Sequence, residues 1–246
     1  MPISRPDHVL ILGGTRDSAH LAGLLTEQGI PVTTSLAGRT RSAKALAGQV
    51  RVGGFGGVDG LIAWMKDHGV SHLVDATHPF AAKISHNAYE AAQKGNIPLC
   101  RLNRPEWQAR DGDAWHHVSD HDSARLALEP YKRVFLAIGR LELAGYSNCR
   151  DHWFLMRMID DPGPIARPDG EIILSRPASA VEDEIHLMDK HRVDCLITKN
   201  AGGSASYAKI EAARQLGLPV IMIDRPSLPE CFTTESAEGA FDWLTS

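Results

Sequence analysis

The chain has 246 residues, which suits one large domain or two small ones. Its 43% hydrophobic and 23% charged residues are ordinary for a globular protein. The formal net charge of -4 argues against nucleic-acid binding as the main role, because a surface that follows phosphates usually carries a basic excess.

The cysteines and the apolar runs exclude further classes of protein. Cys100, Cys149, Cys195 and Cys231 lie far apart without a CxxC pair, so we expect neither a disulfide framework nor a metal site. The first apolar run, HVLIL (8–12), is too short for a signal peptide. No stretch approaches the roughly 20 apolar residues of a membrane span. The sequence therefore predicts a cytoplasmic protein with no membrane partner.

The first hundred residues alternate between short apolar runs and helical patterns. Strands are predicted at 8–12, 31–38, 49–57, 71–80 and 97–102. Helices are predicted at 17–29, 58–69 and 81–95. This alternation of strand and helix predicts a parallel, doubly wound sheet.

Composition changes over 104–122, a polar stretch with two tryptophans and little periodicity. We place a domain boundary there, with residues 1–104 in a first domain and 105–246 in a second. Alternation then resumes, with strands predicted at 133–139, 153–159, 194–200 and 218–226. Helices are predicted at 183–193, 204–217 and 236–244, and 160–170 is predicted to be a Pro/Gly loop.

The first strand runs into a tight turn and then a helix. The residues of this turn are Gly13, Gly14, Thr15 and Arg16. Backbone N–H groups and the positive end of the helix dipole favour a phosphate at such a place, and glycine lets the ligand come close. The GxGxxG pattern is incomplete, because Asp17 and Ser18 stand where a further glycine is expected. A purely steric role for the glycines therefore stays open.

The end of the second strand indicates which dinucleotide would bind. NAD-binding sheets usually carry an acid there, about 20 residues past the glycines, for the ribose 2′-hydroxyl. The sequence TTSLAGRTR (33–41) has no acid and offers Ser35, Arg39 and Arg41. A hydroxyl and arginines suit a 2′-phosphate, which favours NADPH over a plain solvated loop.

Two more strand ends carry candidate cofactor residues. GGFGG (53–57) would let a ligand approach Gly54 and Gly56, unless it is only a flexible crossover. DATHPF (75–80) would place Thr77 and His78 at the carboxyl edge of the sheet, where open α/β folds bind ligands. The alternative is that Thr-His-Pro only caps the next helix.

The second half repeats this design in ITKNAGGSAS (197–206). Lys199 and Asn200 would project from a strand end, and Gly202 and Gly203 would turn the chain. Ser204 would cap the next helix and so create a second helix start that favours anions. Arg140, which follows the predicted strand at 133–139, is a weaker example of a cation placed after a strand end.

These motifs together resemble the precorrin-6A reductases of cobalamin biosynthesis. The resemblance runs in order from about residue 8 to residue 226, through ILGGT, SLAGR, GGFGG, DATHPFA, RPEW and TKNAGG. It implies an α/β fold of two Rossmann-like parallel-sheet domains with a cleft between them, the first binding NADPH and the second completing the substrate site. It also implies hydride transfer to carbon 19 of precorrin-6A, with a proton added at carbon 18, to give precorrin-6B.

The implied substrate is a large tetrapyrrole polycarboxylate. Lys199, Arg140, Arg104 and Lys209 are therefore expected carboxylate contacts. His78, Lys199, water or a substrate carboxylate could supply the proton. Hand-over of the product to the next pathway enzyme is a further expectation.

Three alternatives stay open or are disfavoured by the sequence. The counterpart enzyme of the anaerobic route, which takes the cobalt-containing substrate, would carry the same protein motifs. A non-catalytic NADP-sensing protein would bind the cofactor without turnover. A short-chain dehydrogenase is disfavoured, because no Tyr-x-x-x-Lys pair occurs.

Overall fold

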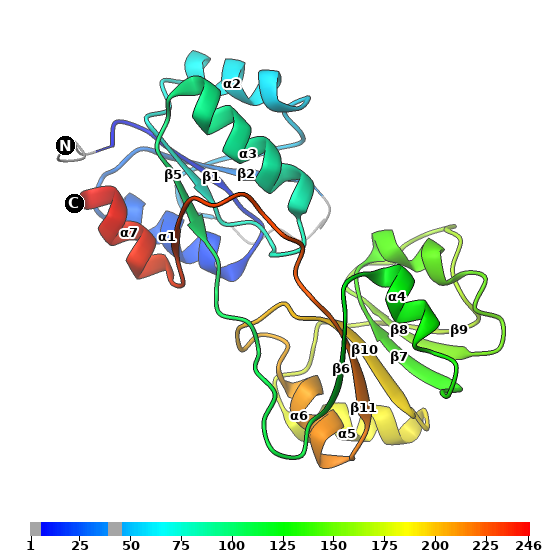
Figure 1. Ribbon diagram of the computed structural model, residues 1–246. Coiled ribbons are helices and arrows are strands. Elements are labelled where there is room, and N and C mark those ends of the chain that lie inside the picture. Colours follow the sequence, from blue (N-terminus) through cyan, green and yellow to red (C-terminus); the bar gives the residue numbers. More distant parts are fainter. Residues whose placement is uncertain (1–5, 39–45) are drawn as a thin grey trace. The chain divides into compact units, whose positions relative to one another are not determined.

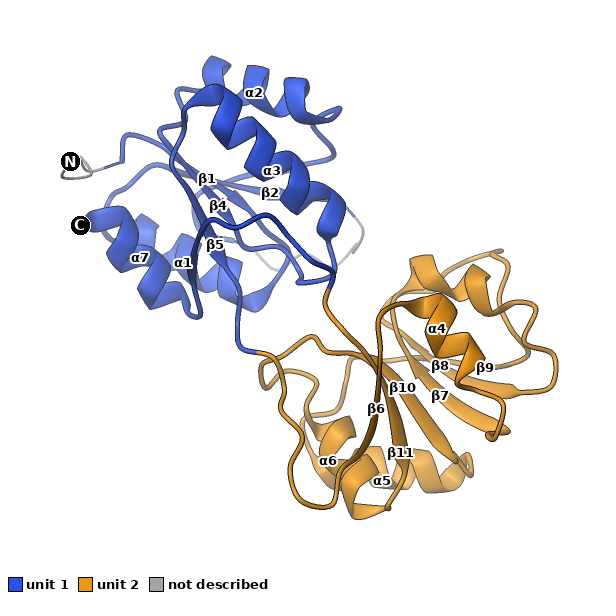
Figure 2. Cartoon of the chain, in the orientation of Figure 1, with its two compact units in different colours: residues 1–105, 226–246 blue, residues 106–225 orange. Residues whose placement is uncertain are grey.

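The protein folds into two compact units, drawn in different colours in Figure 2. The structure is a computed structural model that describes residues 6–38 and 46–246. Unit 1 comprises residues 1–105 and 226–246, and unit 2 comprises residues 106–225. The expected domain boundary, between residues 104 and 105, lies one residue before the point where the chain leaves unit 1 and enters unit 2. Residues 226–246, which we expected in the second domain, instead belong to unit 1.

Unit 1 is built on a six-stranded parallel sheet with the order β12-β5-β4-β1-β2-β3 (Figure 1). Its strands are β1 (Val9–Leu12), β2 (Val32–Leu36), β3 (Gln49–Val52), β4 (His72–Asp75), β5 (Leu99–Leu102) and β12 (Phe232–Thr234). Its helices are α1 (Arg16–Glu27), α2 (Val58–Asp67), α3 (Ala82–Gly95) and α7 (Ala237–Thr245).

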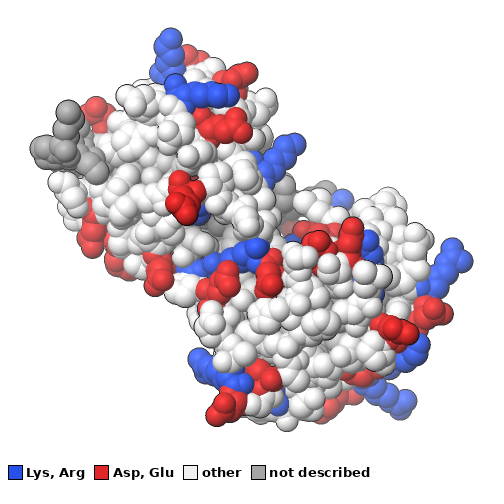
Figure 3. Space-filling view, in the orientation of Figure 1, with Lys and Arg blue, Asp and Glu red and all other residues white. Residues whose placement is uncertain are grey.

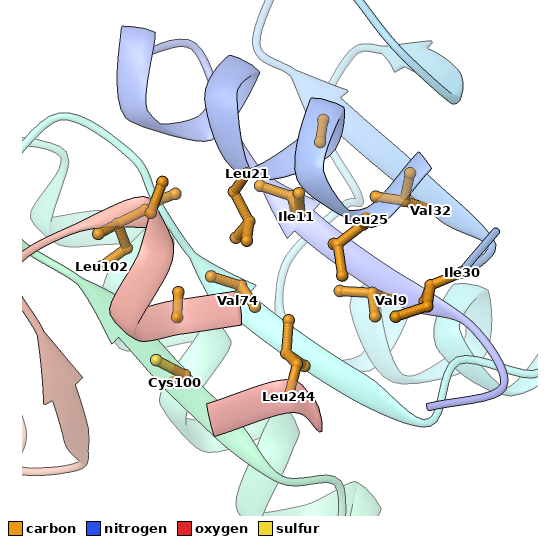
Figure 4. Close-up of a cluster of buried hydrophobic side chains, with 14 residues drawn as sticks. Val9, Ile11, Leu21, Leu25, Ile30, Val32, Val74, Cys100, Leu102 and Leu244 are labelled. Carbon is orange, nitrogen blue, oxygen red and sulfur yellow. The ribbon is translucent and has the colours of Figure 1, made fainter. Parts of the chain in front are cut away.

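Alternate residues of the central strand β1 feed two separate cores of unit 1. Val9 and Ile11 pack with side chains of α1 and α7, including Leu21 and Leu244 (Figure 4). Leu10 and Leu12 point to the other face of the sheet and pack with side chains of α2 and α3. A strand covered on both faces has no polar side, which explains the unbroken apolar run in the sequence.

The C-terminal residues return to unit 1 because they complete its sheet and one of its cores. β12 pairs in parallel with β5, with Phe232 opposite Cys100. Ala240 and Leu244 of α7 are fully buried in the same cluster as Leu21. Figure 1 shows α7 beside α1.

Unit 2 contains a second six-stranded parallel sheet, with the order β6-β11-β10-β7-β8-β9. Its strands are β6 (Ala114–Val118), β7 (Arg133–Ala137), β8 (Trp153–Met158), β9 (Gly170–Leu174), β10 (Cys195–Lys199) and β11 (Pro219–Ile223). Its helices are α4 (His121–Leu126), the 3-10 helix η1 (Arg140–Tyr146), α5 (Val181–Lys190) and α6 (Ala208–Gln215). The prediction of two α/β units with parallel sheets is confirmed.

Three strands and two short helices were not predicted. β6, β9 and β12 carry mostly exposed or half-buried residues, and each lies at one end of its sheet. α4 and η1 are too short to show a helical period. Among the described residues, no helix is long and apolar enough to cross a membrane. On the face drawn in Figure 3, acidic and basic side chains are interspersed rather than gathered in a basic field.

Candidate functional site

The candidate residues gather at the carboxyl edge of the sheet in each unit. Because every strand pair is parallel, the carboxyl ends of the strands share one edge, and open α/β sheets bind ligands there. The edge of unit 1 carries those predicted cofactor residues that the structure describes, and the edge of unit 2 carries most of the predicted substrate residues.

The two glycines after β1 have different roles. A Cβ on Gly13 would lie 2.7 Å from Thr34 Cγ2, so this position has no room for a side chain. Gly14 has a φ of 114°, and in the part of the chain that the structure describes no atom lies within 4 Å of the place where a Cβ would stand. The backbone at Gly14 is therefore open to an approaching ligand.

A capping box occupies part of the predicted phosphate-binding turn. Thr15 Oγ1 accepts from the Ser18 N–H at 3.1 Å and donates to the Ala76 carbonyl at 2.9 Å. Ser18 Oγ accepts from the N–H groups of Gly14 and Thr15, both at 3.1 Å. Ser18 thus stands where the motif expects a glycine because its hydroxyl closes the turn. The first-turn amides of Arg16 and Asp17 have no hydrogen-bond partner among the described residues, which is the arrangement that favours an anion at a helix start.

Arg104, an expected substrate contact, lies beside this same turn. Its Nη1 is 3.1 Å from Asp17 Oδ2. The guanidinium is therefore paired with an acid at the start of α1, within unit 1. The expectation that Arg104 contacts a substrate carboxylate stays a prediction.

Ser35, at the carboxyl end of β2, is bound by an arginine that the sequence analysis did not identify. Arg51 Nη1 donates to Ser35 Oγ at 2.7 Å. The same guanidinium donates to the carbonyls of Gly53 and Gly54 and lies 3.7 Å from the centre of the Phe55 ring. A sequence signal existed, since Arg51 comes two residues before the GGFGG loop. Arg39 and Arg41 lie outside the described residues.

The glycines of the GGFGG loop meet two requirements. Gly53, Gly56 and Gly57 have φ values of 119°, 81° and 101°, which favour glycine. At Gly54 and Gly56, no atom of the described residues lies within 4 Å of a hypothetical Cβ. The loop backbone is therefore open to a ligand, as a cofactor-binding role requires.

At the end of β4, Thr77 and His78 do not cap a helix. α3 starts at Ala82, and its N-cap residue Ala81 provides no side-chain bond. Thr77 Oγ1 donates to Asp75 Oδ1 at 2.7 Å, whereas His78 is exposed and its Nδ1 accepts from the Phe80 N–H at 3.3 Å. The capping alternative is therefore wrong, and both residues remain at the sheet edge.

In unit 2, Lys199 ends β10 and forms an ion pair. Its Nζ is 2.5 Å from Glu142 Oε1 on η1. Burial alone would raise the pKa of Glu142, but the Lys199 ammonium outweighs that effect and the pKa is lowered. Arg140, at the start of η1, is exposed and has no partner among the described residues.

A second pair of polar side chains, His121 and Tyr146, interacts electrostatically with this ion pair. His121 Nδ1 is 3.0 Å from the Tyr146 hydroxyl. Burial, assisted by the nearby Lys199 charge, lowers the pKa of His121, and burial raises the pKa of Tyr146. The edge of unit 2 thus holds a cluster of four titratable side chains, Lys199, Glu142, His121 and Tyr146.

The loop after β10 binds protein backbone. Asn200 is 1% exposed; its Oδ1 accepts from the Trp107 N–H at 2.9 Å, and its Nδ2 donates to the Trp107 carbonyl at 3.2 Å. The Gly203 carbonyl accepts from Trp107 Nε1 at 2.7 Å. These bonds hold the buried Asn200 side chain on the Trp107 backbone, and its assignment as a substrate contact stays a prediction.

The expected helix start at Ser204 is also corrected. α6 begins four positions later, at Ala208, and no side chain caps it. Gly202 and Gly203 adopt φ values of 68° and 70°, so they form a left-handed turn rather than a helix N-terminus. The turn therefore does not place a helix N-terminus at Ser204, and the substrate-binding role of Gly202, Gly203 and Ser204 stays a prediction.

Lys209 is not a surface contact for carboxylates. It is 5% exposed, its Nζ donates to the Ser206 carbonyl at 2.7 Å, and it lies 4.8 Å from the Trp107 ring centre. Burial lowers the pKa of Lys209 to about 7. Nearby, Arg157 and Glu184 form a buried pair through two hydrogen bonds.

Two parallel sheets with helices, and an open glycine turn at the carboxyl edge of the first, define an α/β protein with the edge at which such folds bind ligands. The family model "Precorrin-6x reductase CbiJ/CobK" matches residues 8–245. The chain belongs to this family, which places it among the oxidoreductases of cobalamin biosynthesis. The resemblance seen in the sequence is thereby confirmed.

Individual relatives match over nearly the whole chain. A precorrin-6A reductase from Rhodococcus erythropolis is 46% identical over 239 residues, which are 96% of this chain and 96% of that protein. The solved structure of a CobK precorrin-6A reductase has 42% sequence identity and a TM-score of 0.91, and covers 96% of this chain and 95% of its own.

A relative named for the cobalt-containing substrate is less similar. The cobalt-precorrin-6A reductase of Salmonella typhimurium is 31% identical over 234 residues, which are 89% of this chain and 88% of that protein. The chain is therefore closer to the relatives named precorrin-6A reductase.

Proposed function

We propose that the chain reduces precorrin-6A to precorrin-6B with NADPH, adding a hydride to carbon 19 and a proton to carbon 18. The observation that carries this proposal is the 46% identity to a precorrin-6A reductase over 96% of both chains. The cobalt-containing substrate is the second candidate, since the Salmonella typhimurium relative is 31% identical.

The edge of unit 1 fits the diphosphate and ribose of a dinucleotide. The open backbone at Gly14, the amides of Arg16 and Asp17, and the positive end of α1 offer a place for phosphate. Gly54 and Gly56 leave room beside the next strand end. Thr77 and His78 complete this edge. When bound, the nicotinamide supplies the hydride.

The edge of unit 2 offers two kinds of group to an anionic macrocycle. Arg140 is an exposed cation without a partner among the described residues, so it suits a substrate carboxylate. Its neighbour Leu141 is 65% exposed, which suits the apolar surface of the ring. Lys199 is already neutralised by Glu142, so it is less suited to hold an anion.

The Lys199–Glu142 pair suits a proton transfer instead. Glu142 fixes the ammonium group in one position at the sheet edge. Lys199 Nζ would give its proton to carbon 18, and the neutral amine would then recover a proton from solvent. His78, exposed at the edge of unit 1, is the other candidate donor.

An isotope experiment tests the assignment of the two hydrogens. Turnover with NADPH deuterated at nicotinamide carbon 4 should place deuterium at carbon 19, and turnover in D₂O should place it at carbon 18. NMR of the product distinguishes the two positions. Solvent deuterium at carbon 19 would contradict direct hydride transfer.

The proposal also covers the cellular location of the protein and the fate of its product. We place the protein in the cytoplasm, in keeping with four cysteines that are all free thiols. The proposal also includes hand-over of the product to the next pathway enzyme, and we assign no residue to that step.

A further inference from the structure

We propose that Arg51 recognises the 2′-phosphate of the adenosine ribose and thereby couples cofactor choice to the position of the GGFGG loop. This inference rests on the proposed use of NADPH. It assigns a binding role to a residue of β3, whereas the sequence pattern pointed to the residues that follow β2.

The first argument is the position of Arg51 in the sheet. In the parallel pairing of β2 with β3, Arg51 lies opposite Ser35. Ser35 lies about 20 residues past the glycine turn, where an NAD-binding sheet carries the acid that binds the ribose 2′-hydroxyl. Arg51 Nη1 reaches Ser35 Oγ at 2.7 Å, so a guanidinium stands beside the place of that acid.

The second argument is the set of donors that remains on the guanidinium. An arginine has five N–H donors in a planar fork. Nη1 uses both of its hydrogens, on Ser35 Oγ and on the Gly53 carbonyl at 3.0 Å, and Nη2 uses one on the Gly54 carbonyl at 3.1 Å. The Nε–H and the second Nη2–H have no partner among the described residues. Two neighbouring donors on one planar group match the bidentate geometry of phosphate recognition.

The third argument is charge. Other arginines of the protein pair with carboxylates, such as Arg104 with Asp17 and Arg214 with Asp113. Arg51 has no carboxylate partner among the described residues, and it stacks on the Phe55 ring at 3.7 Å. Partial burial lowers the pKa of Arg51, yet an arginine stays charged near neutral pH. An incompletely solvated, unpaired cation favours an anion as its partner.

The same contacts connect this cation to the loop. Arg51 holds the carbonyls of Gly53 and Gly54, and its ring partner Phe55 is the central residue of GGFGG. A phosphate bound to the free side of the guanidinium would fix the arginine, and through it the loop. Recognition and loop position thus depend on one side chain.

The test measures binding rather than turnover. Dissociation constants are determined for NADPH, NADH, 2′,5′-ADP and 5′-AMP with the full chain and with Arg51→Ala, Arg51→Lys and, as a control, Lys66→Ala. Lys66 is an exposed cation on α2 of the same unit. We expect Arg51→Ala to raise the dissociation constants of NADPH and 2′,5′-ADP about tenfold or more. The dissociation constants of NADH and 5′-AMP should rise less than about threefold.

Two further results keep the test decisive. Arg51→Lys should lie between wild type and Arg51→Ala, because it keeps the charge and loses the fork, and Lys66→Ala should behave as wild type. If Arg51→Ala does not fold, Arg51→Lys must itself show a loss of affinity that is larger for NADPH and 2′,5′-ADP than for NADH and 5′-AMP. An equal loss of affinity for all four ligands, or no loss, would overturn the assignment. If the wild-type chain itself does not prefer 2′,5′-ADP to 5′-AMP, the proposed use of NADPH fails instead.

Discussion

Lys199 and Glu142 carry opposite charges 2.5 Å apart, so the pair offers a proton rather than net charge to an anionic substrate. We expect Lys199→Met to lower kcat by about 10²-fold, in the range for loss of a general acid, with little change in KM. Arg140→Ala should do the opposite and raise KM with kcat nearly unchanged. Steady-state kinetics separates the two effects, and unchanged kinetics in Lys199→Met would reduce Lys199 to a structural role.

Arg39 follows β2 in the sequence and lies outside the described residues. The sequence predicts that Arg39→Ala raises the NADPH dissociation constant by about tenfold and the NADH constant far less, because only NADPH carries the 2′-phosphate. Fluorescence titration with both cofactors checks this. Equal effects on the two constants would remove Arg39 from the 2′-phosphate site.

Lys209 makes stability depend on pH. Its folded-state pKa of about 7 lies below the ordinary value of 10.5, so between these values the unfolded chain binds more protons and stability rises with pH. Below pH 7 the buried ammonium adds an excess positive charge beside the neutral Arg157–Glu184 pair. We expect Lys209→Met to raise the melting temperature at pH 6, by several degrees for about 1 kcal/mol, and this advantage to shrink as the pH rises from 7 towards 10.5. A pH-independent difference in thermal melts would contradict this.

At the scale of elements, Gly60 controls the packing of α2 against the GGFGG loop. A Cβ on Gly60 would stand 1.7 Å from the Phe55 carbonyl oxygen. We expect Gly60→Ala to cost about 2–3 kcal/mol of unfolding free energy, as overpacking does, and to weaken NADPH binding. Urea unfolding measures the loss.

Gly23 provides the matched control for that substitution. It lies inside α1, and a Cβ there would meet no described residue within 4 Å. Gly23→Ala should therefore stabilise the protein by about 0.5–1 kcal/mol through helix propensity. Equal changes in the free energy of unfolding for Gly60→Ala and Gly23→Ala would show that the close approach of Gly60 to Phe55 does not affect stability.

The elements that the sequence predicted are those with a strong local signal. β1, β4 and β10 are short buried runs, and α1 carries its own capping box, so neighbouring residues suffice to define them. β12 is only three residues long and depends on pairing with β5, a contact that no local pattern encodes. The same reasoning explains why the return of the C-terminus to unit 1 was missed.

Within the site, motifs identified the glycines and Lys199 but not their partners. Glu142 lies 57 residues before Lys199, and Arg51 lies 16 residues after Ser35. Neither pair forms a recognisable string, because strand order and not chain order brings the partners together. The backbone contact of Asn200 was missed for a related reason, since its partner Trp107 lies 93 residues away.

At the scale of the whole molecule, unit 2 is one continuous segment and unit 1 is not. Residues 106–225 contain a complete sheet and its core, whereas residues 1–105 lack β12 and α7. Without α7, the buried cluster of Val9, Leu21 and Leu25 would lose Ala240 and Leu244. Each large apolar side chain that is left exposed in the fragment lowers the free energy of unfolding by about 1.5–3 kcal/mol.

We therefore expect the fragment 106–225 to melt cooperatively on its own and the fragment 1–105 not to do so. Circular dichroism melts and the dispersion of NMR amide signals distinguish a folded fragment from an unfolded one. The control is 1–105 mixed with a peptide of residues 226–246, which should regain structure. Cooperative melting of 1–105 alone would contradict the role given to the C-terminal residues.

The most direct test of the central claim is NADPH absorbance under anaerobic conditions, before and after precorrin-6A is added to the purified protein. The account predicts that NADPH stays reduced until the tetrapyrrole is added and is then oxidised in equal amount to it, while NADH gives little reaction. Tight binding of NADPH without oxidation by precorrin-6A would contradict the proposed function, and oxidation with cobalt-precorrin-6A alone would assign the chain to the cobalt-containing substrate.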